Sequence, residues 1–382
     1  MIKVINFLGN RIGSGGIESF VTNMSEGMID SGIDYTICVN YKTANIYEFR
    51  LRKNGANVVY LRKRPVNYIL KLFDFIQYIS KNKDAILYLH ASTPGMYLHA
   101  FLAKCLGVSK IVYHIHSTPG NRVSLPRKIK DSLLRYLFSS IPQINVACSL
   151  SAGNDFFKEK EYRIVHNGID VERFKFSSVL RKQTRKELDI GNEFLLVQIG
   201  RFSAPKNQFF TLEMMKNCIN KIKKLKLLFI GEGQYEKGMR EFIKENGLED
   251  CVIIIPPDKN VERFYMAADL LMFPSEFEGL GIVALEAEVS GLPILASSCF
   301  VDEVCFTNFI ERINLNDFGK WEKRINEYSR MRLNREELSS IGYKECINKG
   351  FSINNGRKEL VKIYNECEVQ ENINQPGNGG EN

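Results

Sequence analysis

The chain has 382 residues, of which 44% are hydrophobic and 25% charged, so it is long enough for two domains and has the composition of an ordinary soluble globular protein. No apolar run reaches the roughly 18 residues that a membrane span needs. The nine cysteines include no Cys-x-x-Cys pair, which argues against a disulfide framework and a zinc site. The net charge of +8 is unevenly placed, because residues 1–170 hold 22 Lys and Arg against 12 Asp and Glu.

The chain begins with a strand pattern over residues 2–8 and lacks the layout of a signal peptide, which favours a cytoplasmic protein. A glycine-containing loop follows, and then a helical pattern whose apolar positions start at Ile17. A loop between a strand and a helix N-terminus can bind phosphate through backbone N–H groups. The full dinucleotide fingerprint is absent, so Gly15 and Gly16 indicate either a phosphate-binding turn or only a tight turn.

Helical patterns then alternate with further strand patterns, which lie near residues 35–39, 57–61, 85–90 and 111–116. This alternation predicts a parallel, doubly wound sheet, in which ligand-binding groups gather beyond the carboxyl ends of the strands. His116 and His90 each end one of these strands, so both are candidates for such groups. His114 lies one pleat before His116 on the same face, and we expect it to be a packed core residue.

The positive charge of the first half gathers in two clusters, at residues 61–65 and 122–138, and the second is a predicted amphipathic basic helix. Its apolar side is formed by Ile129, Leu133, Leu134 and Leu137. Such a helix fits a dock on anionic lipid headgroups, and it fits equally a surface helix with a solvated basic face. Nucleic acid is a weaker alternative, because neither interleaved aromatic residues nor a known reader motif accompanies the charge.

A polar, charged run at 177–192 is the expected linker to a second domain, where the strand and helix alternation starts again at Phe194. Arg201 lies just past the end of this strand, and Lys206 lies at the start of the next helix. Two fixed cations on one loop suit a diphosphate, since charge-assisted hydrogen bonds are each worth about 1.5–3 kcal/mol. An Arg and a Lys in a loop are also common as solvated charges without a ligand.

The stretch from Asp269 to Glu286 combines a buried strand, a turn with two glycines and the beginning of a helix. Free N–H groups and the positive end of the helix dipole favour an anion at such a turn, and Gly279 and Gly281 would let it approach closely. Glu278 and Glu286 flank the turn, and carboxylates accept hydrogen bonds from sugar hydroxyls. These features together predict a sugar nucleotide, although two unrelated surface acids on a solvated turn would give the same pattern.

Four motifs of the chain together resemble those of the retaining family-4 glycosyltransferases of the GT-B fold. They are Gly15-Gly16-Ile17-Glu18, Gly200-Arg201 with Lys206-Asn207, Gly231-Glu232-Gly233, and Pro274-Ser275 with Glu278-Gly279-Leu280-Gly281, Glu286, Gly291 and Pro293. The resemblance extends from residue 2 to about residue 367. It implies an α/β fold of two doubly wound Rossmann-like domains that face each other across a cleft.

The resemblance also implies a division of the chain into two domains and a tail. It implies an N-terminal, acceptor-side domain over residues 1–175, to which a C-terminal helix at 351–368 returns, and a donor-binding domain over residues 190–350. The tail at 369–382 has almost nothing to bury, and we expect it to be disordered.

The same resemblance implies roles for the motif residues. The catalytic centre would consist of His116, Glu278, Arg201 and Lys206. The donor would bind to Gly15, Gly16, Arg201, Lys206, Glu232, Gly279, Leu280, Gly281 and Glu286. Glu18 and His90 would lie on the acceptor side. The two cations would stabilise the leaving diphosphate in place of a divalent metal, so neither a metal nor a cofactor is expected.

The implied reaction moves a sugar from a nucleotide diphosphate, with UDP as the first choice, to an acceptor hydroxyl with retention of configuration. Pro256 and Pro257 stand where most relatives have a glycine in the loop that meets the nucleobase, so the base stays open. The basic first domain favours a lipid-linked or growing polysaccharide acceptor, as in capsule or exopolysaccharide assembly, with peripheral contact at the inner face of the membrane. The alternatives are an epimerase or hydrolase of sugar nucleotides on the same fold, and a non-catalytic sugar-nucleotide-binding scaffold.

Overall fold

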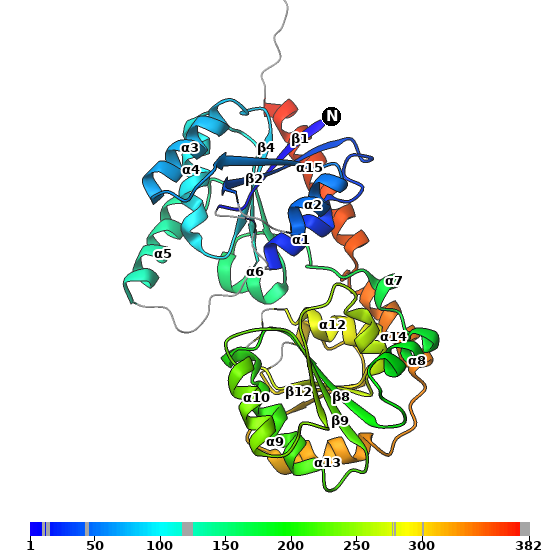
Figure 1. Ribbon diagram of the computed structural model, residues 1–382. Helices are drawn as coiled ribbons and strands as arrows, with labels where there is room; N and C mark the ends of the chain where they lie inside the picture. The colour runs from blue at the N-terminus through cyan, green and yellow to red at the C-terminus, as the bar shows by residue number, and fades with distance from the viewer. Residues whose placement is uncertain are drawn as a thin grey trace, which may run out of the picture. The chain divides into compact units, whose positions relative to one another are not determined.

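The computed structural model describes residues 1–9, 12, 16–42, 46–116, 125–276, 278, 280–299 and 302–374. The chain divides into two compact units: unit 1 contains residues 1–168 and the C-terminal segment from 353 onward, and unit 2 contains residues 169–352. Each unit is a parallel sheet with helices on both faces (Figure 1). The predicted architecture of two doubly wound Rossmann-like domains is therefore confirmed.

Among the described residues, unit 1 forms a seven-stranded parallel sheet in the order β3-β2-β1-β4-β5-β6-β7. Its strands are β1 (Ile2–Phe7), β2 (Ile33–Tyr41), β3 (Asn57–Arg62), β4 (Ile86–Ala91), β5 (Ile111–Ile115), β6 (Ile144–Ala147) and β7 (Arg163–Ile164). One face of the sheet is covered by α1 (Gly16–Ser25), α2 (Ile46–Lys53) and α15 (Ile353–Asn374). The other face is covered by α3 (Tyr68–Ser80), α4 (Tyr97–Cys105) and α6 (Leu150–Phe157), and α5 (Leu125–Phe138) packs beside α4.

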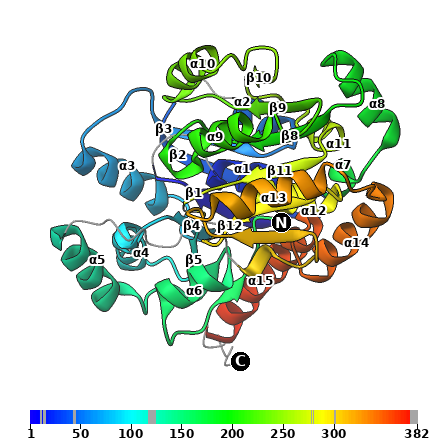
Figure 2. The same cartoon turned by 90° about the horizontal axis from the view of Figure 1, so that it is seen from below.

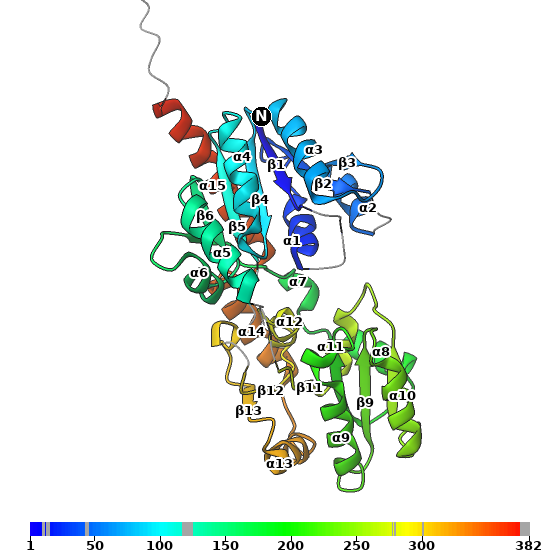
Figure 3. The same cartoon turned by 90° about the vertical axis from the view of Figure 1, so that its left-hand side faces the viewer.

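Helix α15 belongs to unit 1 although its sequence follows unit 2 (Figure 3). Its apolar side buries Leu360, Ile363 and Tyr364 against the same core as helix α1. A returning helix is thus present where one was expected at 351–368. The helix continues through residue 374, so the expected start of the tail at residue 369 falls inside α15, and residues 375–382 lie outside the described residues.

Unit 2 forms a second parallel sheet, which has six strands in the described part of the chain, in the order β10-β9-β8-β11-β12-β13. The strands are β8 (Phe194–Ile199), β9 (Leu225–Ile230), β10 (Val252–Ile255), β11 (Leu270–Phe273), β12 (Ile294–Ser297) and β13 (Ile310–Ile313). One core contains side chains of α7 (Val171–Phe174), α11 (Glu262–Ala267), α12 (Ile282–Val289) and α14 (Arg335–Asn348). The other contains side chains of α9 (Gln208–Cys218), α10 (Glu236–Glu245) and α13 (Phe318–Tyr328).

The polar run at 177–192 is not a linker, and that prediction is wrong. Residues Ser178–Glu187 form helix α8, with the Ser177 hydroxyl as its N-cap, and the helix lies inside unit 2. Its arginines are anchored to the sheet, because Arg181 and Arg185 pair with Asp269 and donate hydrogen bonds to the carbonyl of Ala267. Two charges of this run are therefore held in ion pairs with Asp269, whereas Lys182, Lys186, Glu187 and Asp189 are exposed.

The strand order reverses direction at one place in each sheet. In unit 1 the reversal lies between β1 and β4, and in unit 2 it lies between β8 and β11. At such a switch point the loops that leave the two neighbouring strands lie on opposite faces, which opens a crevice for ligands at the carboxyl ends. His90 lies at the end of β4, and Arg201, Lys206 and Glu278 lie in the loops that follow β8 and β11.

Candidate active site

The predicted site residues fall into two groups, one in each unit. Unit 1 holds Gly16, Glu18, His90 and His116, and unit 2 holds Arg201, Lys206, Glu232, Glu278, Leu280, Gly281 and Glu286. Gly15 and Gly279 lie outside the described residues. Each group is described by itself.

In unit 2, the loops that follow β8 and β11 touch each other. Their strands are neighbours in the sheet, and the backbone N–H of Glu276 in the second loop donates to the carbonyl of Pro205 in the first at 2.9 Å. The first loop contains Arg201 and Lys206, and the second contains Glu278. The strand pairing therefore brings together residues that are 72 positions apart in the sequence.

Lys206 and Glu278 form an ion pair between these loops. The Lys206 ammonium donates to Oε1 of Glu278, and the Ser275 hydroxyl donates to the same oxygen at 2.6 Å. The Lys206 ammonium also lies 5.5 Å from the centre of the Phe273 ring. The Glu278 side chain is 9% exposed and that of Lys206 is 24% exposed, so the pair is shielded from water on most sides.

Arg201 and Glu232 are exposed and lie on adjoining loops. The N–H of Phe202 donates to the Glu232 carbonyl at 2.9 Å, which ties the loop after β8 to the loop after β9. The guanidinium of Arg201 makes no hydrogen bond or ion pair with the residues that the structure describes. Unlike Lys206, this cation has no ion-pair partner in the part of the chain that the structure describes, and its side chain is exposed.

Two glycines permit the close approach of the loops after β8 and β9. A Cβ atom on Gly231 would lie 2.0 Å from the carbonyl oxygen of Gly200, and one on Gly233 would lie 2.3 Å from that of Phe202. Both glycines also have positive φ, at 153° and 156°. Any side chain at these two positions would force the loops apart.

Helix α12 carries the second acid of the motif. Gly281 caps this helix with a left-handed φ of 78°, and Leu280 before it is buried. The Glu286 carboxylate accepts a 2.5 Å hydrogen bond from the hydroxyl of Tyr265 on helix α11. Burial raises the pKa of Glu286 to about 7, while the Tyr265 hydroxyl partly opposes that rise, so this carboxyl changes its charge near neutral pH.

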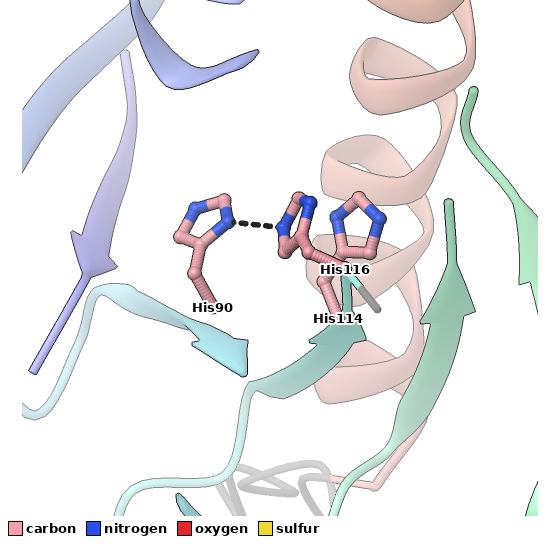
Figure 4. Close-up of side chains that lie close together, drawn as sticks. All are labelled: His90, His114 and His116. Carbon is pink, nitrogen blue, oxygen red and sulfur yellow. Dashed lines mark hydrogen bonds between the residues drawn. The ribbon is translucent and has the colours of Figure 1, made fainter. Parts of the chain in front are cut away.

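In unit 1, His116 and His90 are brought together at the carboxyl ends of β5 and β4. His90 Nδ1 lies 2.9 Å from His116 Nε2, as the dashed line in Figure 4 shows. His90 is 2% exposed, so it does not present its ring to solvent as an acceptor-binding residue would. His114 is fully buried, bonds to the Tyr88 hydroxyl and stacks beside His116, which agrees with its expected place in the core.

Three histidines at this site raise the question of a metal ion. One ring nitrogen from each of His90, His114 and His116 can be chosen so that all three lie within 4.8 Å of one another. Tetrahedral zinc with Zn–N bonds of about 2.0–2.1 Å would separate its nitrogens by about 3.3 Å, which exceeds the 2.9 Å between His90 and His116. The ring centroids of His114 and His116 lie only 3.8 Å apart, with the ring planes tilted by 32° to each other. Lone pairs that share an ion must each point at it in the plane of their own ring, which such closely stacked rings do not favour. The cluster fits a hydrogen-bonded arrangement better than a zinc site.

The first glycine loop is described only in part. Gly16 is the first residue of helix α1 and is exposed, and Glu18 lies in the first turn of this helix with a partly buried side chain. An acidic residue in the first turn complements the helix dipole. The position of Glu18 is thus compatible with a ligand at this loop and also with helix stabilisation alone.

Two residues of these sites escaped the sequence prediction. Asn6 on β1 accepts from His90, and Tyr265 holds Glu286. A polar Asn inside the apolar run of β1 was a signal that could have been used. Tyr265 gave no such signal, because its contact depends on the packing of α11 against α12.

Two family models match the chain side by side. Glycosyltransferase Family 4 matches residues 14–173, and Glycosyl transferases group 1 matches residues 181–344. With two doubly wound units and these matches, the class of the protein is defined: it is an enzyme that transfers sugars. The chain belongs to the group-1, family-4 glycosyltransferases, and its fold is GT-B.

Related proteins support this placement. EpsF of Bacillus subtilis is 22% identical over 373 residues, which covers 92% of this chain and 93% of EpsF. The UDP-Gal:alpha-D-GlcNAc-diphosphoundecaprenol alpha-1,3-galactosyltransferase of Escherichia coli is 24% identical over 315 residues, covering 77% of this chain and 78% of the enzyme. Among solved structures, Anabaena HepE in complex with UDP and glucose superposes with a TM-score of 0.79 at 16% identity, covering 96% of this chain and all of HepE. The structural likeness concerns the fold.

Proposed function

We propose that this enzyme is a retaining glycosyltransferase that uses a UDP-sugar as donor without a metal ion. The observation that carries the proposal is the meeting of the loops after β8 and β11, which sets Arg201, Lys206 and Glu278 at one strand-order reversal. An exposed Arg and a Lys at this place suit a diphosphate, which is the leaving group of the reaction.

Each residue has a distinct role in this proposal. Arg201 and Lys206 neutralise the charge that grows on the departing diphosphate, which is the task of a metal ion in other transferases. Glu286 accepts hydrogen bonds from the ribose hydroxyls, and Glu278 orients the sugar. Lys206 must then leave Glu278 when the diphosphate arrives, so donor binding frees the Glu278 carboxylate for the sugar hydroxyls.

The configuration at the anomeric carbon is retained when the acceptor oxygen attacks from the same face from which the leaving group departs. The bond between the anomeric carbon and the diphosphate oxygen breaks, and the bond between that carbon and the acceptor oxygen forms on the same side. The proton of the acceptor hydroxyl passes to the departing phosphate oxygen, so the products are the glycosylated acceptor and UDP. This front-side path requires no covalent sugar–enzyme intermediate.

The choice of UDP and of the acceptor rests on relatives. HepE has been crystallised with UDP, and the Escherichia coli relative is named for UDP-galactose and a diphosphoundecaprenol-linked sugar. We therefore propose a lipid-linked or growing polysaccharide acceptor in capsule or exopolysaccharide biosynthesis, on the cytoplasmic side of the membrane.

A surface of unit 1 favours peripheral membrane contact. Helices α3, α4 and α5 lie together on one side of this unit (Figure 2), and both α3 and α5 expose large apolar side chains. Those with the largest exposed fractions are Ile69 (76%), Phe73 (60%), Leu125 (70%), Ile129 (62%) and Tyr136 (85%). Lys128 and Lys130 stand exposed among them on α5. Apolar side chains interspersed with lysines suit the headgroup region of an anionic bilayer.

Among the helices of the described residues, none has the length and apolar character needed to cross a membrane. The proposed contact is peripheral, at the surface of the bilayer. It predicts binding of the full chain to vesicles of phosphatidylglycerol and phosphatidylcholine in a sedimentation assay, with much weaker binding to phosphatidylcholine alone. Ile129→Ser with Leu133→Ser should abolish it, whereas Val179→Ser, which removes a 75% exposed side chain from unit 2, should not. Equal binding by all variants would contradict the assignment of this surface.

The donor proposal is tested by thermal unfolding with UDP, GDP and ADP in the presence of EDTA. A ligand at about 100 times its dissociation constant stabilises by about 2.7 kcal/mol, so a metal-independent shift with UDP alone supports the proposal. Transfer is then measured with UDP-sugars and lipid-linked acceptors, and the anomeric configuration of the product is read by NMR. An inverted product would exclude retention. UDP binding without turnover on any acceptor would support the non-catalytic scaffold, and conversion of the donor sugar alone would support the epimerase.

A further inference from the structure

Positive charge is concentrated at one edge of the sheet of unit 1. Residues 33–80, from β2 to α3, hold eight Lys and Arg against three Asp and Glu, a surplus of five positive charges in a chain whose net charge is +8. Strand β3 ends the described sheet on this side, and it lies beside β2, α2 and α3 (Figure 3). One of the three acids, Asp34, lies at the amino end of β2, so only two acids remain near the carboxyl ends of these strands.

These two acids are already bonded within the protein. Glu48 accepts hydrogen bonds from the hydroxyl of Tyr60 and, at 3.0 Å, from Nε of Arg52. Asp74 accepts from two nitrogens of the Arg62 guanidinium, Nε and, at 3.0 Å, Nη2. Both carboxylates are mostly buried. Each acid of this edge therefore has an arginine of its own, and the other cations of the segment remain in excess.

Three exposed cations remain at the carboxyl ends of β2 and β3, and we call Lys42, Lys63 and Arg64 the basic edge. Lys42 follows β2, and its backbone N–H donates to the carbonyl of Arg62 at 3.2 Å, next to Lys63. The side chains of Lys63 and Arg64 make no ion pair or hydrogen bond with any residue that the structure describes. Lys42 has no ion pair there either, and Glu48, which acts on it electrostatically, is bonded elsewhere.

An apolar surface adjoins the basic edge. Helix α3 starts four residues after Arg64, and the side chain of Asn67 caps it by accepting from the N–H of Leu70 at 3.0 Å. The helix buries Phe75 and Ile79 of its second half. The apolar side chains of its first half are exposed, and they are Tyr68, Ile69, Leu70 and Phe73. Covering such side chains with an apolar ligand lowers the free energy, so this half of α3 is suited to a hydrocarbon.

A ligand for both parts of this surface must join an anion of more than one charge to an apolar group. Clustered cations favour polyanions, and Lys and Arg form charge-assisted hydrogen bonds to phosphate oxygens. A polyisoprenyl diphosphate combines a diphosphate with a long hydrocarbon chain. Free diphosphate lacks the hydrocarbon, and a phosphatidylglycerol headgroup carries only a single phosphate charge. The surface therefore fits a polyisoprenyl diphosphate better than either of these.

We propose that the basic edge binds the diphosphate of a polyisoprenyl-linked acceptor and that the first half of α3 binds its hydrocarbon chain. The inference rests on the proposed function for the reaction, and it selects a lipid-linked acceptor over a growing polysaccharide without a lipid. It also gives two helices of unit 1 different tasks, because α3 contacts the acceptor and α5 contacts the surrounding bilayer.

Calorimetric titration of the full chain with farnesyl diphosphate tests the inference apart from bilayer attachment, because this ligand is soluble without a membrane. We expect it to bind more tightly than inorganic pyrophosphate, which has no hydrocarbon. Lys63→Gln with Arg64→Gln should weaken its binding by about tenfold or more, the value of one charge-assisted contact. Ile69→Ser with Phe73→Ser should weaken binding of farnesyl diphosphate and leave that of pyrophosphate unchanged.

Lys128→Gln with Lys130→Gln is the matched control, because it removes two exposed lysines from α5 of the same unit. It should bind farnesyl diphosphate as the unmodified protein does. All titrations contain excess UDP, so that a diphosphate site in unit 2 does not contribute. Equal affinity for farnesyl diphosphate and pyrophosphate would overturn the inference in favour of a free-diphosphate site. Equal losses in the two lysine-containing pairs, or no loss in Lys63→Gln with Arg64→Gln, would also overturn it.

The outcomes separate this inference from the proposed function, because binding of farnesyl diphosphate requires no turnover. Binding that depends on Lys63 and Arg64 in a chain that transfers no sugar would support the inference while the reaction assignment fails. Sugar transfer to a lipid-free acceptor, by a chain whose farnesyl diphosphate binding does not depend on these residues, would overturn the inference and leave the reaction assignment in place.

Discussion

The two cations of unit 2 are predicted to differ in what their removal does to the free protein. Lys206→Met deletes the partner of a Glu278 carboxylate whose side chain is 9% exposed, while Arg201→Met deletes an exposed side chain without an ion-pair partner among the described residues. Both variants are expected to weaken UDP binding. Only Lys206→Met is expected to lower the stability of unit 2, because it leaves a mostly buried charge with the Ser275 hydroxyl as its remaining described partner.

The magnitudes follow from these contacts. Loss of one partner of a buried polar group costs about 1–3 kcal/mol, and the retained Ser275 hydrogen bond sets the expectation near 1 kcal/mol, or about 2–4 °C in Tm for a unit of this size. A charge-assisted hydrogen bond to the diphosphate is worth about 1.5–3 kcal/mol, which corresponds to about ten- to 150-fold in affinity for Arg201→Met. The loss of UDP affinity for Lys206→Met should be smaller than that for Arg201→Met, since in the free protein this lysine already has Glu278 as a partner.

Calorimetric titration of UDP in EDTA, together with thermal unfolding, measures both effects. Glu278→Gln provides the sharpest control, because it frees Lys206 from its competitor and should bind UDP at least as tightly as the unmodified protein while losing transfer activity. The double variant Lys206→Met with Glu278→Gln should recover the lost stability but not the lost affinity. Unchanged UDP affinity in both cation variants would refute the placement of the diphosphate.

Three further predictions concern unit 2. Burial raises the pKa of Glu286 to about 7, so this carboxyl becomes charged as pH rises from about 6 to 8. Affinity for UDP-glucose should therefore increase over this range, and Glu286→Gln should flatten the increase. Calorimetric titrations at a series of pH values check this prediction. Glu288 is fully buried, and burial raises its pKa to about 8 from an unfolded value near 4.5. The folded state therefore binds the proton of Glu288 more tightly than the unfolded state does. The stability that the protonated Glu288 contributes is lost as pH rises through about 8. Glu288→Gln should therefore reduce the fall in Tm between about pH 5 and 9, and a fall as steep as in the unmodified protein would contradict the assignment. Gly231→Ala should lower Tm by several degrees because its Cβ would lie 2.0 Å from the Gly200 carbonyl oxygen, whereas Gly319→Ala, whose Cβ meets no atom within 4 Å, should be neutral.

Much of the fold could be predicted from the sequence, because the strands of a parallel sheet read as short apolar runs between helical patterns. The runs at 2–8, 85–90 and 111–116 became β1, β4 and β5 with small shifts at their ends. The run at 177–192 could not be assigned correctly, since nothing in its polar composition indicates that Arg181 and Arg185 bond to Asp269, 88 and 84 residues away.

The candidate site was predictable to the extent that its residues follow strands. Lys206 and Glu278 were each recognised, but their ion pair depends on the β8 and β11 pairing, which the order of strands in the sequence does not give. The position of His90 in the core depends on its contact with Asn6, from a strand 84 residues earlier. Roles for these residues remain predictions that rest on the family resemblance and on this geometry.

The most direct test of the central claim is a crystal structure of the full chain with UDP in the absence of divalent metal. The account predicts the diphosphate on Arg201 and Lys206, with the Lys206 ammonium released from Glu278 and the ribose hydroxyls on Glu286. A diphosphate bound elsewhere, or a Lys206 that keeps its contact with Glu278 while UDP is present, would contradict it.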